Sequence, residues 1–220
     1  SIILVGSNFI APTEVENTYI AEAAEQVPIM LLNAAYDHPN VYSTLCDDHA
    51  AMYEAATAML DAGIRRILYL YNSNSYSGTR KRRGIEDAFK KAGITDIKTY
   101  VRFYNGKTDP LNAVADFIEQ MADSGVIFDG VIASEDALAI GAVKYARRRG
   151  LNVPQDLSVI GCNNSILTDC CTPELTSVDN RLETLSHQLV QTLLHVINGE
   201  EMPKKAIFSG KLMKRSTTNF

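Results

Sequence analysis

The stretch Gly130-Val-Ile-Ala-Ser-Glu-Asp-Ala-Leu-Ala-Ile-Gly141 contains the unit that decides the fold. Its first four residues form an uncharged apolar run, which predicts a strand at Gly130–Ala133 that is covered on both faces. Apolar residues at helical spacing then predict a helix over Glu135–Arg149. Gly150 stops this helix, and three arginines occupy its last turn, where the helix dipole favours cations.

The same order of strand and then helix recurs along the chain on both sides of this unit. Further strands are predicted at Ile2–Val5, Pro28–Leu32, Ile67–Tyr71 and Leu157–Gly161, with weaker ones at Val41–Leu45 and Ile97–Phe103. Further helices are predicted at His49–Ala62, Thr79–Ala92, Asp109–Asp123 and Leu182–Ile197, each with a glycine near its end, and short strands at 204–218. This alternation is typical of an α/β fold with parallel, doubly wound sheets.

The bulk composition limits the partners of the chain. Its 220 residues carry a net charge of −5, which makes the chain as a whole a poor polyanion binder. If it works on nucleic acid, another segment must hold the DNA. No apolar run approaches the roughly 18 residues of a membrane span. The first residues, Ser1–Gly6, show no charged n-region or cleavage site and read as a strand already under way, so we expect the chain to be a fragment.

The four cysteines, Cys46, Cys162, Cys170 and Cys171, suit neither a disulfide framework nor a zinc site, because two are adjacent. We expect free thiols in a reducing cytosol. The four histidines are scattered, and neither phosphate-cradling glycine loops nor nucleophile or zinc-protease motifs occur. We therefore predict no catalytic residue, no cofactor and no metal, and a protein that is not an enzyme.

Polar residues follow three of the predicted strands. They are the loop 72–78, the segment 134–136 and the segment 162–164. Because ligands of open α/β sheets sit beyond the carboxyl ends of strands, these residues predict a site for a polar ligand. For Asp136 the alternative is a charge that favours the helix start, and for Asn163 it is a turn residue.

The basic run at 80–83 has three interpretations. It is a solvated surface, or it turns one or two cations toward ligand oxygens, or it is a nucleic-acid patch. The last is the weakest, because no aromatic residues are interleaved with the cations.

Several motifs along the chain resemble those in the effector-binding core of the lactose/galactose repressor (LacI/GalR) family of bacterial transcription regulators. The family pattern D-x-x-A-x-G, G-x-x-V-P-x-D-x-x-V-x-G and P-x-L-T-x-V is matched in order by Asp136–Gly141, Gly150–Gly161 and Pro173–Val178. Ala62–Ile67 is similar to G-H-R-R-I with Ile64 in place of histidine, and Leu212–Thr217 is similar to the closing L-x-x-R-x-S/T.

The resemblance implies a periplasmic-binding-protein-like fold of two lobes joined by three crossovers, with an effector between them. The N-terminal lobe would take residues 1–44 and 179–205, and the C-terminal lobe 45–178 and 206–220. The first lobe would be incomplete, and the helix-turn-helix head that binds DNA would be absent.

Carried over residue by residue, the resemblance also implies the ligand contacts. Asn163 stands where the family has an aspartate that grips sugar hydroxyls, and Glu135 where an asparagine is frequent. The family's cleft arginine corresponds to Lys81 or to its neighbour Arg80, and Phe103 or Tyr104 to a stacking aromatic. With the strand-end reasoning, the predicted site is Ser75, Arg80, Lys81, Phe103, Glu135, Asp136 and Asn163. These departures point away from an ordinary neutral monosaccharide, within the class of carbohydrates and small polar metabolites.

The implied function is the effector-binding, dimerising core of a cytoplasmic transcription regulator, in which the ligand controls DNA binding allosterically. The rivals are a secreted sugar-binding receptor and an enzyme of a doubly wound fold.

Overall fold

The computed structural model describes residues 1–6, 10–11, 15–106 and 111–220, which divide into two compact units. The first unit contains residues 1–48, 73–80 and 181–210, and the second contains 49–72, 81–180 and 211–220. Residues 73–80, which the sequence analysis assigned to the second lobe, pack with the first unit. One reason is that the Ser77 hydroxyl donates a hydrogen bond of 2.6 Å to the carboxylate of Asp48.

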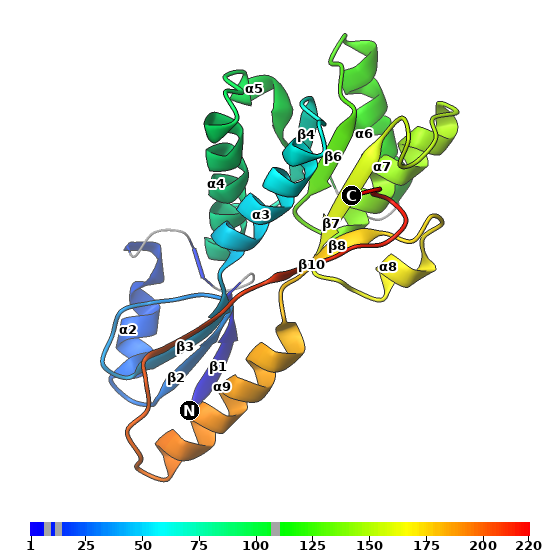
Figure 1. The fold of residues 1–220 in the computed structure, drawn as a ribbon. Coiled ribbons are helices and arrows are strands. Elements are labelled where there is room, and N and C mark those ends of the chain that lie inside the picture. The colour runs from blue at the N-terminus through cyan, green and yellow to red at the C-terminus, as the bar shows by residue number, and fades with distance from the viewer. Residues whose placement is uncertain (7–9, 12–14, 107–110) are drawn as a thin grey trace. The chain divides into compact units, whose positions relative to one another are not determined.

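The second unit is built on a six-stranded sheet in the order β10-β8-β7-β6-β4-β5 (Figure 1). Neighbouring strands are parallel, except that β10 pairs antiparallel with β8 at one edge. The strands are β4 (Ile67–Tyr71), β5 (Val101–Phe103), β6 (Gly130–Ala133), β7 (Ser158–Cys162), β8 (Thr176–Asp179) and β10 (Lys211–Met213). The carboxyl ends of the parallel strands therefore share one edge of this sheet.

Alternate residues of the central strands face two separate cores. Leu68 and Leu70 pack under α6 and α7, whereas Ile67 and Tyr69 pack under α3 and α4. This is the period of two of a pleated strand, and burial on both faces explains the continuous apolar runs. The helices are α3 (Asp48–Asp61), α4 (Tyr76–Lys91), α6 (Leu111–Asp123) and α7 (Asp136–Arg148), with the short α5 (Ile97–Tyr100) and α8 (Leu167–Cys170) beside them.

The first unit has a four-stranded parallel sheet in the order β1-β2-β3-β9. Ile20 of α2 packs on one face of it with Ile29, and Leu185 and Leu189 of α9 pack on the other with Met30. The elements are β1 (Ile2–Val5), the 3-10 turn η1 (Val15–Asn17), α2 (Thr18–Ala24), β2 (Ile29–Leu32), β3 (Val41–Cys46), α9 (Leu182–Ile197) and β9 (Lys205–Phe208). The predicted α/β class with parallel sheets is confirmed.

Most predicted elements lie within a residue of their observed bounds, but one prediction is wrong. The segment Ile97–Phe103 is not a strand throughout, because the Asp96 carboxylate accepts a hydrogen bond from the Thr99 amide and starts α5. Helix α4 also begins three residues before the predicted Thr79. The predicted helix start at 109–110 lies outside the described residues. Helices α2 and α8 are not among the elements predicted from the sequence.

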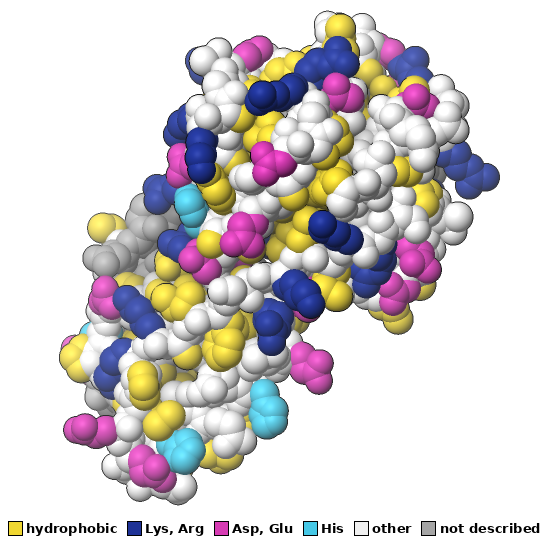
Figure 2. All heavy atoms as spheres, in the orientation of Figure 1, with side chains coloured by type: hydrophobic (Ala, Val, Ile, Leu, Met, Phe, Trp, Pro, Cys, Tyr) yellow, Lys and Arg dark blue, Asp and Glu magenta, His cyan; other side chains and the backbone are white. Residues whose placement is uncertain are grey.

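Among the described residues, no helix is long and apolar enough to cross a membrane. On the face drawn in Figure 2, basic and acidic side chains are interspersed. The predicted basic run at 80–83 has internal partners: Arg80 pairs with Asp47, and Arg82 contacts Glu86 and the Tyr71 hydroxyl. These internal partners argue against a nucleic-acid patch, and Lys81 of the same run is buried and not solvated.

Gly141 lies where α7 crosses α6. A methyl group at this position would overlap Cβ and Cγ1 of Val114, so glycine allows the two helices to approach closely. The glycine of the D-x-x-A-x-G pattern is thus explained by helix packing.

We predict that Gly141→Ala lowers the free energy of unfolding by about 1–3 kcal/mol, through overpacking against Val114. In a Val114→Gly background, which removes both overlapping atoms, the same change becomes neutral or stabilising, since alanine favours a helix by about 1 kcal/mol over glycine. Urea unfolding of the four variants measures the coupling. Equal effects in both backgrounds would contradict the packing explanation.

Candidate functional site

Polar side chains gather at the carboxyl edge of the six-stranded sheet in the second unit. They follow β4, β6, β7 and β8, and α4 adds an ammonium group. We name this set the strand-end cluster: Asn72, Lys81, Ser134, Glu135, Asn163 and Asn180. The predicted convergence of polar strand ends is therefore present in the structure.

Lys81 lies at the centre of the strand-end cluster. Its side chain is only 6% exposed, and Nζ donates to the Ser134 carbonyl at 3.2 Å and to Asn163 Oδ1 at 3.4 Å. A buried ammonium group must be compensated by such oxygens, because its desolvation is costly. Of the two neighbouring cations, Lys81 belongs to this cluster in the second unit, whereas Arg80 belongs to the first unit.

Asn163 and Asn180 form an amide pair beside Lys81. Asn180 Nδ2 donates to Asn163 Oδ1 at 3.1 Å, and Asn180 is 7% exposed. Asn163 has a φ of 102°, a left-handed conformation that asparagine tolerates better than most residues, and its side chain projects at the end of β7. Asn163 thus combines a turn conformation with contacts to the cluster.

Glu135 follows Ser134 and is half-buried. Its Oε1 accepts a hydrogen bond of 2.9 Å from Asn72 Nδ2. Burial raises the pKa of Glu135 above its ordinary value, and the Asn72 hydrogen bond and the positive charge of Lys81 only partly oppose this effect. The hydrogen bonds and charges around the Glu135 carboxylate therefore do not fully offset the cost of its burial.

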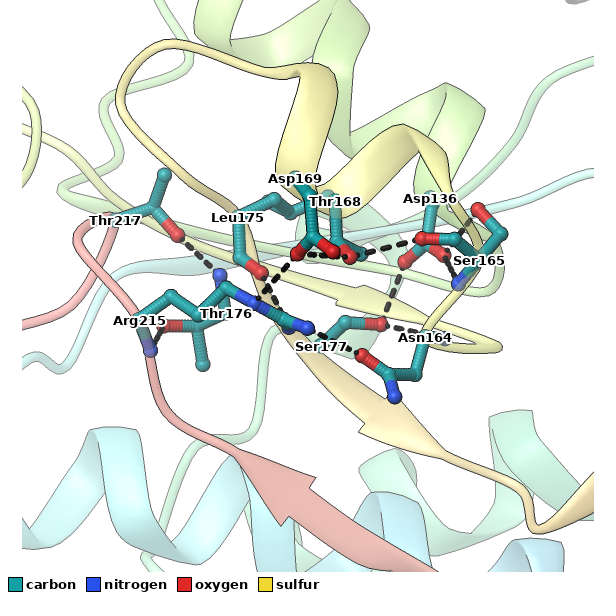
Figure 3. Close-up of polar contacts among 10 residues, drawn as sticks. All are labelled: Asp136, Asn164, Ser165, Thr168, Asp169, Leu175, Thr176, Ser177, Arg215 and Thr217. Atoms are coloured by element: carbon teal, nitrogen blue, oxygen red, sulfur yellow. Dashed lines mark hydrogen bonds and ion pairs between the residues drawn. The ribbon is translucent and has the colours of Figure 1, made fainter.

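Asp136, the next residue, lies in a different environment (Figure 3). Its carboxylate accepts hydrogen bonds from the amide and the hydroxyl of Ser165, both at 2.8 Å, and from the Ser177 hydroxyl at 2.6 Å. It is 2% exposed, and a side chain at Gly161 would overlap its Oδ1. These contacts tie α7 to the loop after β7 and to β8.

The C-terminal segment extends this network, as Figure 3 shows. Arg215 donates to Asn164 Oδ1 at 2.9 Å and to the Leu175 carbonyl at 3.1 Å, and pairs with Asp169 at 3.1 Å. The Thr217 hydroxyl donates to the Val159 carbonyl and accepts from the Thr176 amide. The closing L-x-x-R-x-S/T pattern therefore holds the C-terminal segment against β7, β8 and α8.

The two candidate aromatic residues differ in exposure. The Phe103 ring is 40% exposed and meets the Tyr71 ring edge-on, with centroids 5.2 Å apart. Tyr104 is buried and packs on Phe117. Phe103 therefore offers an accessible ring at the end of β5, the neighbour of β4.

Ser75 and Arg80 lie in the first unit. The Ser75 hydroxyl accepts a hydrogen bond from the Gly78 amide at 3.2 Å, as an N-terminal cap of α4 does. Arg80 pairs with Asp47 at 3.0 Å. Both side chains therefore have structural partners within their unit.

Asn180 and Asn72 are not among the site residues predicted from the sequence. Both directly follow strands, β8 and β4, so the strand-end rule contained the signal. The strand before Asn180 is not recognisable as one from its apolar pattern, because Thr176–Asp179 contains a single aliphatic residue.

The family model described as a periplasmic binding protein-like domain matches residues 56–218. The chain belongs to this family. An HTH-type transcriptional regulator from Lachnoclostridium phytofermentans is 43% identical over 221 residues, which cover 100% of this chain and 65% of the relative. The regulator AscG from Escherichia coli K12 is 29% identical over 98% of this chain and 62% of its own length. The chain thus spans less than two thirds of both relatives.

The structure of the chain is also similar to solved structures of transcription regulators. The sugar-binding transcriptional regulator of the LacI family from Escherichia coli, complexed with phosphate, matches with a TM-score of 0.82 and 26% identity. The match covers 98% of this chain and 76% of that one. The comparisons confirm the predicted resemblance to LacI/GalR regulators.

We predict that Asp136→Ala lowers the free energy of unfolding by about 3 kcal/mol, because it leaves the buried Ser177 hydroxyl and the partly buried Ser165 donors without an acceptor. Asp116→Ala, which removes an exposed partner of Arg148, is the control and should cost less than about 1 kcal/mol. Urea unfolding measures both. Similar losses in the two variants would contradict the special place of Asp136.

The pKa of Glu135 predicts a pH dependence of stability. A carboxyl group whose pKa is raised on folding contributes stability at low pH that is lost as pH rises through the folded-state pKa. Glu135→Gln does not ionise, so its melting temperature should gain on that of the wild type between about pH 4 and pH 7. Thermal unfolding across this range checks the sign, and a constant difference would refute it.

Proposed function

We propose that the chain is the effector-binding and dimerising core of a LacI/GalR-type transcription regulator, in which a sugar or other small polar metabolite controls DNA binding. The observation that carries this proposal is the strand-end cluster, in a chain that is 43% identical to an HTH-type transcriptional regulator. Side chains from four strand ends and from α4 converge there, as recognition of a polar ligand requires.

The chemistry of the cluster suits a ligand rich in hydroxyl groups. Asn163 offers an amide that both donates and accepts, and Glu135 offers a carboxylate that accepts. The exposed Phe103 ring supplies a flat apolar surface for the ring of a sugar. Ser75, Arg80 and Asp136 remain proposed contacts, although their described partners give each a structural role.

The proposed mechanism is a shift between two arrangements of the protein. A ligand changes such an equilibrium only by binding one arrangement more tightly than the other. DNA would be held by a segment other than the residues described, since the chain carries a net charge of −5. The protein would act as a cytoplasmic homodimer without enzymatic activity.

Disrupting the gene tests the regulatory role. We expect transcripts of neighbouring genes to change at least several-fold, as measured by RNA sequencing. Any change in the uptake of labelled sugars should come after this change in transcripts and be explained by it. An unchanged transcript profile with an immediate loss of sugar uptake would instead support a transport receptor. Turnover of a bound ligand by the purified protein would support an enzyme.

Variants of the strand-end cluster test the binding site. For a sugar or metabolite that raises the melting temperature of the chain, Asn163→Ala and Lys81→Ala should each weaken binding about tenfold or more, as measured by calorimetry. Arg83→Ala, an exposed change on the same helix, is the matched control. Unchanged affinity in Asn163→Ala, whose side chain is exposed, would place the ligand elsewhere.

A further inference from the structure

Three charged side chains lie at the carboxyl edge of the six-stranded sheet. They are Lys81, Glu135 and Asp136, and they differ in how far the protein itself uses their charge. That difference decides which charge a ligand meets there.

The two charges that are buried have internal partners. Lys81 is 6% exposed and directs Nζ to the Ser134 carbonyl and to Asn163 Oδ1. Asp136 is 2% exposed and accepts three hydrogen bonds from Ser165 and Ser177. Both charges are therefore already compensated by partners within the protein.

Glu135 is the carboxylate that stays available. Among the described residues it accepts one hydrogen bond, from the neutral amide of Asn72, and forms no ion pair within 4 Å. An ionised carboxylate offers about four acceptor positions, so most of its capacity is unused. It is also half-buried, so water compensates it only partly, and its raised pKa reflects this deficit.

We propose that Glu135 binds a positively charged amino group of the ligand, so that the ligand class is an ammonium-bearing polyol such as an amino sugar. An ammonium group would supply the charge and the donors that Glu135 lacks, and charge-assisted hydrogen bonds of this kind are about twice as strong as neutral ones. A phosphorylated sugar would instead bring a second negative charge to this carboxylate. This inference rests on the proposed function, since it specifies the ligand of the same cluster.

The exposed ring of Phe103 fits the same ligand class. Phe103 pairs with Tyr71 across β5 and β4, and Asn72, which holds Glu135, directly follows Tyr71. The guanidinium carbon of Arg82 lies 5.5 Å from the centroid of the Tyr71 ring, whereas the Phe103 ring is exposed. An aromatic face attracts both the apolar side of a sugar ring and a cation.

The test uses the full 220-residue chain and matched sugar sets. Each set contains the amino sugar, its N-acetyl form, the parent sugar and the sugar phosphate, in the gluco, galacto and manno series. We expect the amino sugar of at least one series to bind about tenfold or more tightly than its three counterparts, as measured by calorimetry near pH 7. Glu135→Gln should abolish this preference, while Glu174→Gln, an exposed loss of the same charge, should keep it.

Other outcomes overturn the inference. If a neutral sugar or a sugar phosphate binds most tightly, and equally in Glu135→Gln, the ammonium assignment is wrong while the proposed function stands. If no member of the sets binds, the assignment is wrong as well, and the transcript measurement after gene disruption decides the proposed function separately.

Discussion

Asp136 places a buried carboxylate where three segments of the second unit meet: the start of α7, the loop after β7 and strand β8. It accepts hydrogen bonds from the buried Ser177 hydroxyl and from the partly buried amide and hydroxyl of Ser165, which would otherwise lose their acceptor. Gly161 leaves room for the carboxylate, since a side chain there would overlap it. The positions of the β7 and β8 ends, and with them the strand-end cluster, depend on this one group.

The adjacent residues Glu135 and Asp136 have different roles at the start of α7. Asp136 begins α7 and turns inward to the serines, whereas Glu135 is extended and lies outside the helix. The inner carboxylate accepts three hydrogen bonds, whereas the outer one accepts one among the described residues. One strand-to-helix turn thus supplies both the anchor of the strand ends and the group that is free to bind a ligand.

The sequence allowed the fold to be predicted well, because apolar runs and glycine stops are local signals. The site was predictable only in part. Strand ends identified Glu135 and Asn163, yet which carboxylate would be consumed by Ser165 and Ser177 depends on contacts between distant segments. The start of α5 was missed because the capping side chain of Asp96 outweighed the β-prone residues that follow it.

The C-terminal segment also affects the tendency of the protein to aggregate. The short strand β10 pairs with β8, covers the edge of that strand and itself forms the edge of the six-stranded sheet. Unpaired strand edges recruit strands from other molecules and lead to aggregates. Arg215 and Thr217 hold this segment in place, and they thereby oppose aggregation through the edge of β8.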